Sequence, residues 1–237
     1  AVLRHSNMRR VVGLCNGPIG IERGIAETLK VPKEELYVEF TGLNHMVFAK
    51  KIYHKGIDVT QKVLTLMTQD AGDAVGLKNI ADLEWEPDFF RTLGMIPIGY
   101  LRYYYQTATM LSEQKQSAEK EGTRAEVVQK IEHELFELYK DEHLAIKPPQ
   151  LSERGGAYYS EAACNLINSI YNDKRDIQTV NTRNNGAISD IDCDSAVEVN
   201  CLITKQGPIP LTTGELPIPI KGLVHQIKSF ERIASQA

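Results

Sequence analysis

The sequence contains no long hydrophobic run and no dense tract of lysine or arginine. No apolar stretch approaches the roughly 20 residues that a membrane-spanning helix requires, so no membrane association is expected. The formal net charge of −4, without a clustered basic patch, argues against nucleic acid as a partner. The chain of 237 residues is 42% hydrophobic and 24% charged, which is the composition of an ordinary globular protein with a substantial core.

The sequence is also poor in cysteine and contains no C-x-x-C pair. Its four cysteines, Cys15, Cys164, Cys193 and Cys201, are widely spaced. A chain of this length needs no disulfide to stabilise it, so reduced thiols in a cytoplasmic protein are expected. Cys164 falls within an apolar helical pattern and is expected to pack against neighbours.

The two ends of the chain indicate a part of a longer protein. Residue 1 is Ala1 rather than an initiator methionine, and the last amphipathic segment, residues 221–235, ends without a capping glycine. No internal repeat or low-complexity linker divides the chain. We therefore expect residues 1–237 to form a single, truncated domain.

Hydrophobic periodicity predicts an α+β fold that is mostly helical, with short mixed or antiparallel strands. Thr123 and Glu126 form a capping-box pattern, and Ile131, Leu135 and Leu138 are predicted to be the buried stripe of the helix that follows. The predicted helices are 21–29, 59–67, 100–120, 123–140, 158–171 and 221–235; the predicted strands are 11–14, 36–40, 46–53, 177–180, 197–203 and 209–211; and residues 70–76 are predicted to be a loop.

Cys15 and His45 are the strongest candidates for chemistry. Cys15 lies in the run Gly13-Leu14-Cys15-Asn16-Gly17-Pro18, and His45 ends the run Gly42-Leu43-Asn44-His45 at a junction of two predicted strands. A thiolate and an imidazole flanked by turn-forming residues can share one divalent metal and leave coordination positions open for substrate. Alternatively, Cys15 is a small hydrophobic residue at the end of a buried strand, and His45 is a hydrogen-bonded loop histidine.

Other polar and aromatic segments are weaker candidates. Tyrosines crowd residues 100–105, and a phenol at a helix start acts as a base if a metal or an arginine lowers its pKa; otherwise the segment is simply a partly buried helix start. Arg124 and Arg154 are either anion-binding residues or solvated helix-start arginines. Residues 181–186 form either a turn that binds a polyol or phosphate, or only a turn.

Six segments, taken in order, resemble the family 4 glycoside hydrolases, the NAD- and manganese-dependent group, and most closely their 6-phospho-β-glucosidases. The resemblance runs through nearly the whole chain. The six segments are Gly13-Leu14-Cys15-Asn16, Gly42-Leu43-Asn44-His45, Tyr100-Leu101-Arg102-Tyr103-Tyr104, Thr123-Arg124-Ala125, Arg154-Gly155-Gly156 and Asn181-Thr182-Arg183-Asn184-Asn185-Gly186.

The resemblance implies catalytic roles for a few residues. Cys15 and His45 would be the ligands of Mn²⁺, and Tyr100 would be the base that removes the substrate C2 proton, with Tyr103 as the second choice. NAD would take a hydride from C3, manganese would stabilise the enediolate that forms, and the leaving group at C1 would be eliminated before water adds and the hydride returns.

The resemblance also implies a substrate. Arg124 would bind it near the base, and Asn16 would contact it at a position where the α-glucosidase branch usually has an acidic aspartate, which favours a β-linked sugar. The expected substrate is a phosphorylated disaccharide, and the expected assembly is a homo-oligomer, either a dimer or a tetramer. The family's glycine-rich nucleotide turn is absent from this sequence, so we expect the NAD-binding domain to lie outside it and this chain alone to be inactive.

Three alternatives remain open at this stage. The chain could be a non-catalytic domain that binds sugar phosphates, or it could belong to an α-glucosidase, α-galactosidase or galacturonidase branch of the same family. The third alternative is a glycosidase with two catalytic carboxylates, for which Glu84, Glu86 and Asp88 are the candidates.

Overall fold

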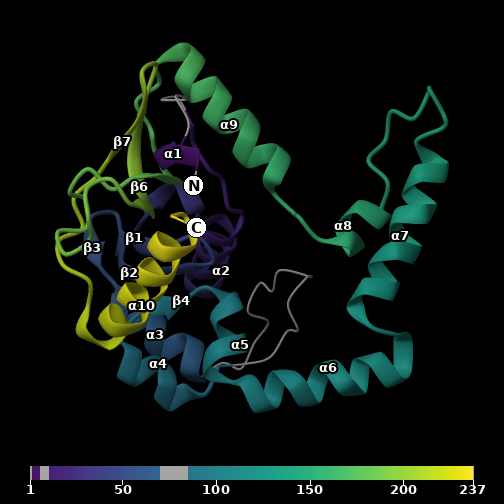
Figure 1. Cartoon of the computed structure of the whole chain (residues 1–237), viewed down its shortest axis with the longest axis horizontal. Helices are drawn as coiled ribbons and strands as arrows, with labels where there is room; N and C mark the ends of the chain where they lie inside the picture. Colours follow the sequence, from purple (N-terminus) through teal and green to yellow (C-terminus); the bar gives the residue numbers. More distant parts are fainter. Residues whose placement is uncertain (1, 6–10, 70–84, 237) are drawn as a thin grey trace.

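The structure is a computed structural model that describes residues 2–5, 11–69 and 85–236 (Figure 1). The loop predicted at residues 70–76 lies outside the described residues. Two antiparallel sheets form the centre of the fold. The first has the strand order β1-β2-β3, with β4 also paired to β2, and the second has the order β5-β6-β7. The strands are β1 (Leu36–Leu43), β2 (Met46–His54), β3 (Ile57–Asp58), β4 (Ile96–Pro97), β5 (Ile177–Arg183), β6 (Ala196–Thr204) and β7 (Gly207–Pro210).

Helices make up most of the remaining described chain, so the predicted α+β class is confirmed. None of these helices is long and apolar enough to cross a membrane within the described ranges. The helices are α1 (Val2–His5), α2 (Gly17–Leu29), η1 (Lys33–Glu35), α3 (Thr60–Gln69), α4 (Pro87–Leu93), η2 (Gly99–Leu101), α5 (Arg102–Tyr105), α6 (Thr107–Glu121), α7 (Arg124–Leu138), α8 (Gln150–Arg154), α9 (Tyr159–Asn172) and α10 (Ile218–Ala234), where η denotes a 3₁₀ helix.

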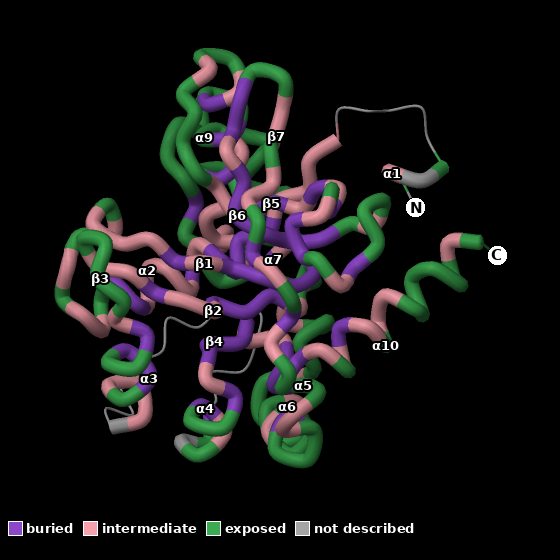
Figure 2. The backbone as a smooth tube through the Cα atoms, turned by 90° about the vertical axis from the view of Figure 1, so that its left-hand side faces the viewer, coloured by how far each residue is buried: buried purple, intermediate pink, exposed green. Residues whose placement is uncertain are grey.

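The core lies where the two sheets meet, with β1 packed against β6. Phe40 and Phe48, from the first sheet, and Val199, from the second, are fully buried. Figure 2 shows that buried residues concentrate in these strands, whereas α6 and α10 are largely exposed. Because burial of apolar side chains is the main favourable contribution to folding, the paired sheets form the rigid support for the loops at their ends.

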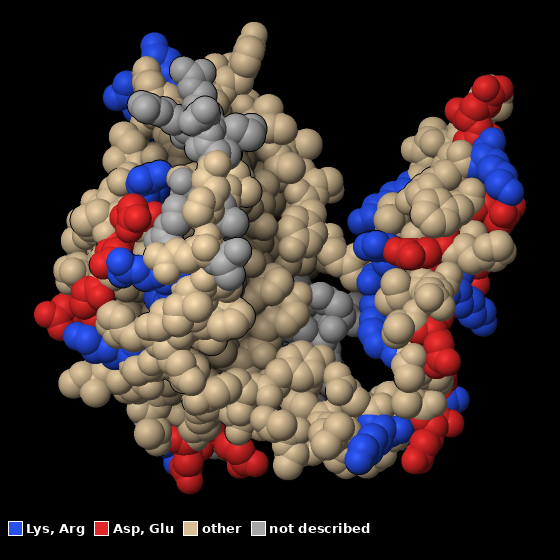
Figure 3. All heavy atoms as spheres, in the orientation of Figure 1, with Lys and Arg blue, Asp and Glu red and all other residues tan. Residues whose placement is uncertain are grey.

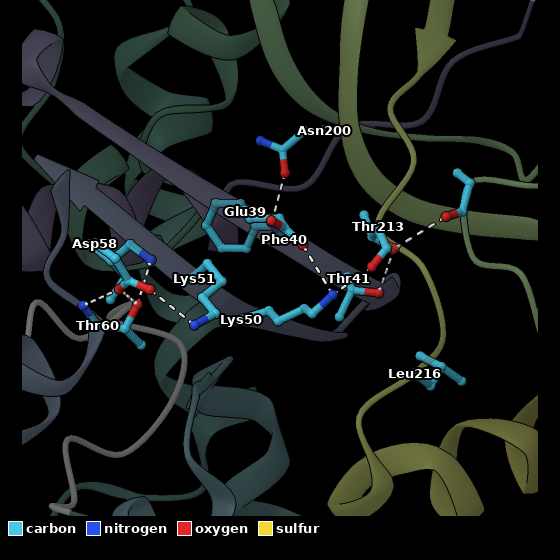
Figure 4. Close-up of polar contacts among 12 residues, drawn as sticks. Glu39, Phe40, Thr41, Lys50, Lys51, Asp58, Thr60, Asn200, Thr213 and Leu216 are labelled. Atoms are coloured by element: carbon cyan, nitrogen blue, oxygen red, sulfur yellow. Dashed lines mark hydrogen bonds and ion pairs between the residues drawn. The ribbon is translucent and has the colours of Figure 1, made fainter. Parts of the chain in front are cut away.

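Asn200 of β6 joins the two sheets through the backbone of β1 (Figure 4). Its Oδ1 accepts a hydrogen bond from the N–H of Phe40 at 2.6 Å, and its Nδ2 donates to the carbonyl of Val38 at 2.9 Å. These groups face away from β2, the only strand beside β1 in its sheet within the described residues. The amide of Asn200 therefore satisfies buried polar groups that would otherwise have no partner.

Replacing Asn200 with alanine is expected to lower the free energy of unfolding by about 2–4 kcal/mol, because two buried backbone groups lose their partners. Urea unfolding followed by circular dichroism measures this change. The exposed Asn172 of α9 provides a matched control, and Asn172→Ala is expected to change stability by less than about 0.5 kcal/mol. Equal stability of the two variants would contradict the role assigned to Asn200.

Helices α6, α7 and α8 form an arm that stands apart from the sheets (Figures 1 and 3). Within the arm, α7 packs on α8, whereas α6 packs mainly on α5. The capping box predicted for the start of α7 is present, because the Thr123 side chain accepts the N–H of Glu126 and the Glu126 carboxylate accepts the N–H of Thr123. The chain leaves the arm at α8 and re-enters the body through α9.

Three sequence predictions on this side of the molecule are wrong. The helix predicted over residues 100–120 is broken at Gln106, between α5 and α6. Leu138 is exposed, unlike Ile131 and Leu135, because only the middle of α7 is covered by neighbouring chain. Cys164 is exposed instead of packed, because α9 turns only one face, which includes Leu166, toward the body.

Candidate functional site

The Cys15 loop leads directly into α2. The backbone of Gly13 pairs with that of Asn181 in β5, with N–H to carbonyl distances of 2.9 and 2.8 Å. Cys15 is buried, and its Sγ accepts hydrogen bonds from the N–H of Gly17, at 3.4 Å, and of His45. A Cβ at Gly17 would lie 2.2 Å from Ile98 Cδ1 and 3.4 Å from Cys15 Sγ, so the buried Ile98 side chain would have to shift to admit a larger residue here.

His45 lies in the tight turn between β1 and β2. The backbone of His45 has a φ of 62°, and that of Gly42, which begins the same sequence motif, has a φ of 136°. A Cβ at Gly42 would lie 2.2 Å from the carbonyl oxygen of Met46, so this turn requires glycine. Desolvation lowers the pKa of the His45 imidazole, which favours the neutral form that binds metals.

Tyr100 lies against His45. The two rings are stacked with centroids 4.3 Å apart, and Tyr100 is held in η2 immediately after β4. His45 thus contacts two residues: its backbone N–H donates to the Cys15 thiol, and its imidazole ring stacks on Tyr100. The structure thus brings three of the residues predicted from the sequence into one cluster, although they come from segments separated by tens of residues.

A second tyrosine belongs to this cluster and was missed by the sequence interpretation. Tyr159 is the first residue of α9, and its hydroxyl lies within hydrogen-bonding reach of the backbone N–H of Asn16. Burial raises the pKa of Tyr159, and negative charge on Cys15 and Tyr100 raises it further. The Tyr158-Tyr159 pair after Gly155-Gly156 was the available signal, because it follows a motif that was recognised.

Glu198 of β6 is the other residue that the sequence interpretation missed. Its side chain is fully buried, and burial raises its pKa to about 8. It pairs across the strands with Asn181, whose Nδ2 donates to Glu198 Oε1 at 2.9 Å and to Asn44 Oδ1 at 3.4 Å. Negative charge on Glu198 contributes to the raised pKa of Cys15, so the carboxylate lies within electrostatic reach of the thiol.

Asn16 and Arg124, the residues predicted to bind substrate, have structural partners. Asn16 is buried, and its Nδ2 donates to the carbonyl of Ala157 at 2.8 Å, which ties the start of α2 to the segment before α9. Arg124 is exposed on the arm, where its guanidinium donates to the carbonyls of Glu153 and Arg154 at 3.0 and 2.8 Å. The structure therefore places Asn16 beside the cluster and Arg124 outside it.

Arg154 and the acidic residues of the two-carboxylate alternative lie at the surface. Arg154 is paired with Glu132 at 2.6 Å on the arm. Glu86 is exposed before α4, and the exposed Asp88 pairs with Arg91 at 2.8 Å. Glu84 lies outside the described residues. Neither Glu86 nor Asp88 is buried, and the structure does not bring the two together in an enclosed site.

Cys15 and His45 lie close enough to supply two donors, a thiolate and an imidazole, to one metal ion. Among the described residues there is no group of three or more His, Cys, Asp or Glu side chains that could hold a metal ion. Burial and the charge on Glu198 raise the pKa of Cys15 to about 11, and a bound cation would offset both effects by stabilising the thiolate. A thiolate and a neutral imidazole fit Mn²⁺ if oxygen ligands complete the shell.

Comparison with known proteins identifies the family of this chain. The family model described as the family 4 glycosyl hydrolase C-terminal domain matches residues 40–237. The chain is 59% identical over its whole length to "Probable 6-phospho-beta-glucosidase" of Bacillus subtilis (strain 168) and 41% identical to "6-phospho-beta-glucosidase" of Escherichia coli (strain K12), and it covers 53% of each. It thus spans about half the length of the curated relatives it matches.

A solved structure of the 6-phospho-beta glucosidase from Thermotoga maritima, with manganese, NAD⁺ and glucose-6-phosphate, superposes on this chain with a TM-score of 0.84 and 32% identity. The similarity covers 100% of this chain and 54% of the Thermotoga protein. The resemblance inferred from the six motifs is confirmed, and the fold agrees with it. The chain belongs to the glycosyl hydrolase family 4 and contains its C-terminal domain.

Proposed function

We propose that this chain forms the metal- and substrate-binding part of a 6-phospho-β-glucosidase, which hydrolyses phosphorylated β-linked disaccharides to glucose 6-phosphate and an aglycon. The observation that carries the proposal is the cluster of Cys15, His45 and Tyr100. Each of these residues comes from a separate motif, and the stacked rings and the backbone bond to the thiol bring them together. The names of the two bacterial relatives support the choice of substrate.

Cys15 and His45 are the residues that would hold Mn²⁺. When bound, Mn²⁺ supplies a Lewis acid to the hydroxyl oxygens of the sugar, and NAD supplies a hydride acceptor and donor. The N-terminus of α2 lies beside the Cys15 thiol, and its partial positive charge favours the thiolate. The neutral imidazole of His45 needs no deprotonation before it binds.

Tyr100 would take the C2 proton of the sugar on its Oη. Its ring is fixed by stacking on His45, so the phenol is held next to the metal ligand and thus next to a sugar bound there. Nearby positive charge lowers the pKa of a phenol and makes it a stronger candidate for the base at neutral pH. Asn16 carries an amide that is bonded to Ala157 and cannot act as an acid, which agrees with a β-linked substrate.

The described residues do not fit NAD. The strands pair antiparallel, whereas a dinucleotide-binding domain uses parallel strands with a glycine-rich turn before a helix, and no such turn occurs in the sequence. We therefore assign no step of hydride transfer to residues of this chain.

Cytoplasmic localisation and a homo-oligomeric state stay predictions. All four cysteines are free thiols, which is typical of proteins in a reducing compartment.

Hydrolysis of p-nitrophenyl 6-phospho-β-glucoside by the full-length protein tests the proposed function. Activity is expected only when NAD, Mn²⁺ and a reductant are all present, because both bound groups take part and the thiol must remain reduced. The α-linked isomer is the matched substrate control and is expected to react far more slowly. Activity that is indifferent to NAD and Mn²⁺ would contradict the proposal and favour hydrolysis by carboxylates.

A further inference from the structure

Glu198 is a buried carboxylate with no cationic partner in the part of the chain that the structure describes. Its Oε1 accepts the hydrogen bond from Asn181, but its Oε2 has no hydrogen-bond partner among the described residues. Removing a carboxylate from water costs several kcal/mol unless a cation or further hydrogen bonds compensate. Such an unsatisfied group in the middle of a well-packed strand calls for a specific reason.

The surroundings of Glu198 concentrate negative charge. The carboxylate lies within electrostatic reach of the Cys15 thiol and of the Tyr159 phenol. A divalent cation bound at Cys15 would attract this carboxylate, because opposite charges attract strongly where water is excluded.

Asn181 connects Glu198 to both loops that carry the candidate metal ligands. Its backbone pairs with Gly13, two residues before Cys15, and its side chain contacts Asn44, the residue before His45. The same side-chain amide donates to Glu198. The carboxylate thus fixes the orientation of the amide that lies between the two loops.

We propose that Glu198 is a positioning residue of the metal site: held by Asn181 behind the Cys15 and His45 loops, its carboxylate strengthens cation binding without ligating the ion. This inference rests on the proposed function, because it assumes that Cys15 and His45 bind Mn²⁺. Residues that support metal ligands in this way typically change metal affinity about 10–100-fold when they are replaced.

Titration of the full-length protein with Mn²⁺, with free Mn²⁺ measured by electron paramagnetic resonance, tests this role independently of activity. Glu198→Gln keeps the shape and removes the charge, and it is expected to weaken Mn²⁺ binding at least about tenfold. The midpoint of thermal unfolding without metal is expected to be no lower than that of wild type, because the substitution removes an uncompensated buried charge. Glu231→Gln on the exposed part of α10 is the matched control and should bind as wild type does.

Wild-type Mn²⁺ affinity in Glu198→Gln would overturn the inference, as would a large loss of metal-free stability with affinity retained, because that pattern indicates only a structural role. Asn181→Ala is the second variant and is expected to weaken binding to a similar extent; unchanged binding in Asn181→Ala would also count against the inference. Cys15→Ser distinguishes failure of the proposed metal site from failure of the role proposed for Glu198. If Cys15→Ser binds Mn²⁺ as tightly as wild type, the proposed metal site itself fails, whatever Glu198→Gln does.

Discussion

Replacing Cys15 with serine is expected to abolish Mn²⁺-dependent turnover of the full-length protein, with a loss of roughly 10³-fold or more. A Lewis-acid metal contributes several kcal/mol to the transition state, and about 4 kcal/mol corresponds to this factor. The serine hydroxyl does not ionise near neutral pH, so it cannot replace the thiolate that α2 and the His45 N–H stabilise. Steady-state turnover at increasing Mn²⁺ concentrations measures the loss.

Cys164→Ser is the matched control for this experiment, because Cys164 is exposed on α9 and lies outside the cluster. It is expected to keep wild-type turnover and wild-type dependence on Mn²⁺. Circular dichroism of both variants establishes that they are folded. If a folded Cys15→Ser variant retained Mn²⁺-dependent turnover, Cys15 would have to be assigned to the core as a small hydrophobic residue.

Replacing Tyr100 with phenylalanine is expected to slow turnover roughly 10²–10⁴-fold, the range that a positioned general base contributes. The aromatic ring and its stacking on His45 are kept, so the change removes only the hydroxyl. The specific readout is exchange of the substrate C2 proton with deuterium from the solvent, followed by nuclear magnetic resonance. This exchange should fall together with turnover, while Mn²⁺ binding should stay the same.

Tyr103→Phe provides the control for this variant. Tyr103 is exposed, and its hydroxyl accepts a hydrogen bond from Gln114 at 3.4 Å on the neighbouring helix, so its loss is expected to leave the exchange unchanged. Normal C2 exchange in Tyr100→Phe would reject Tyr100 as the base. Tyr159 would then be the next candidate, because its phenol lies near the same thiol.

Elements specified by local pattern could be predicted from the sequence. The alternation at Leu36, Val38 and Phe40, and a glycine-containing turn before the next apolar run, predicted the hairpin of β1 and β2 that carries His45. The strand predicted at residues 197–203 is found within β6. The hairpin and the strand are specified by residues close together in the chain, so a single sequence is enough to predict them.

The break at Gln106 could not be predicted in the same way. The tyrosine-rich segment contains no glycine or proline at the break, and helical periodicity continues through it. Long-range contacts fix this segment instead: Tyr100 stacks on His45, and the buried Arg102 lies over the ring of Trp85 at 5.2 Å. Tertiary packing therefore overrides a local pattern that is typical of one continuous helix.

The residues of the candidate site also differ in whether a local sequence pattern could identify them. Cys15 and His45 were identified because each lies in a short run of turn-forming residues. Glu198 was not, because it alternates with Val197 and Val199 and such a pattern predicts a solvent-facing side chain. In the structure both faces of β6 are covered in this region, and Glu198 and Asn200 are as buried as the valines beside them.

The site closes only when segments from distant parts of the chain meet, and this has a consequence for biosynthesis. Asn16 is bonded to Ala157, which lies 141 positions later. At ribosomal rates of roughly 5–20 residues per second, Ala157 is synthesised about 7–28 s after the Cys15 loop, and β5 and β6 follow later. The nascent thiol is open to oxidants and stray metal ions during this interval. If Cys15 and His45 bind manganese as proposed, the complete site forms only after the C-terminal strands have emerged and paired.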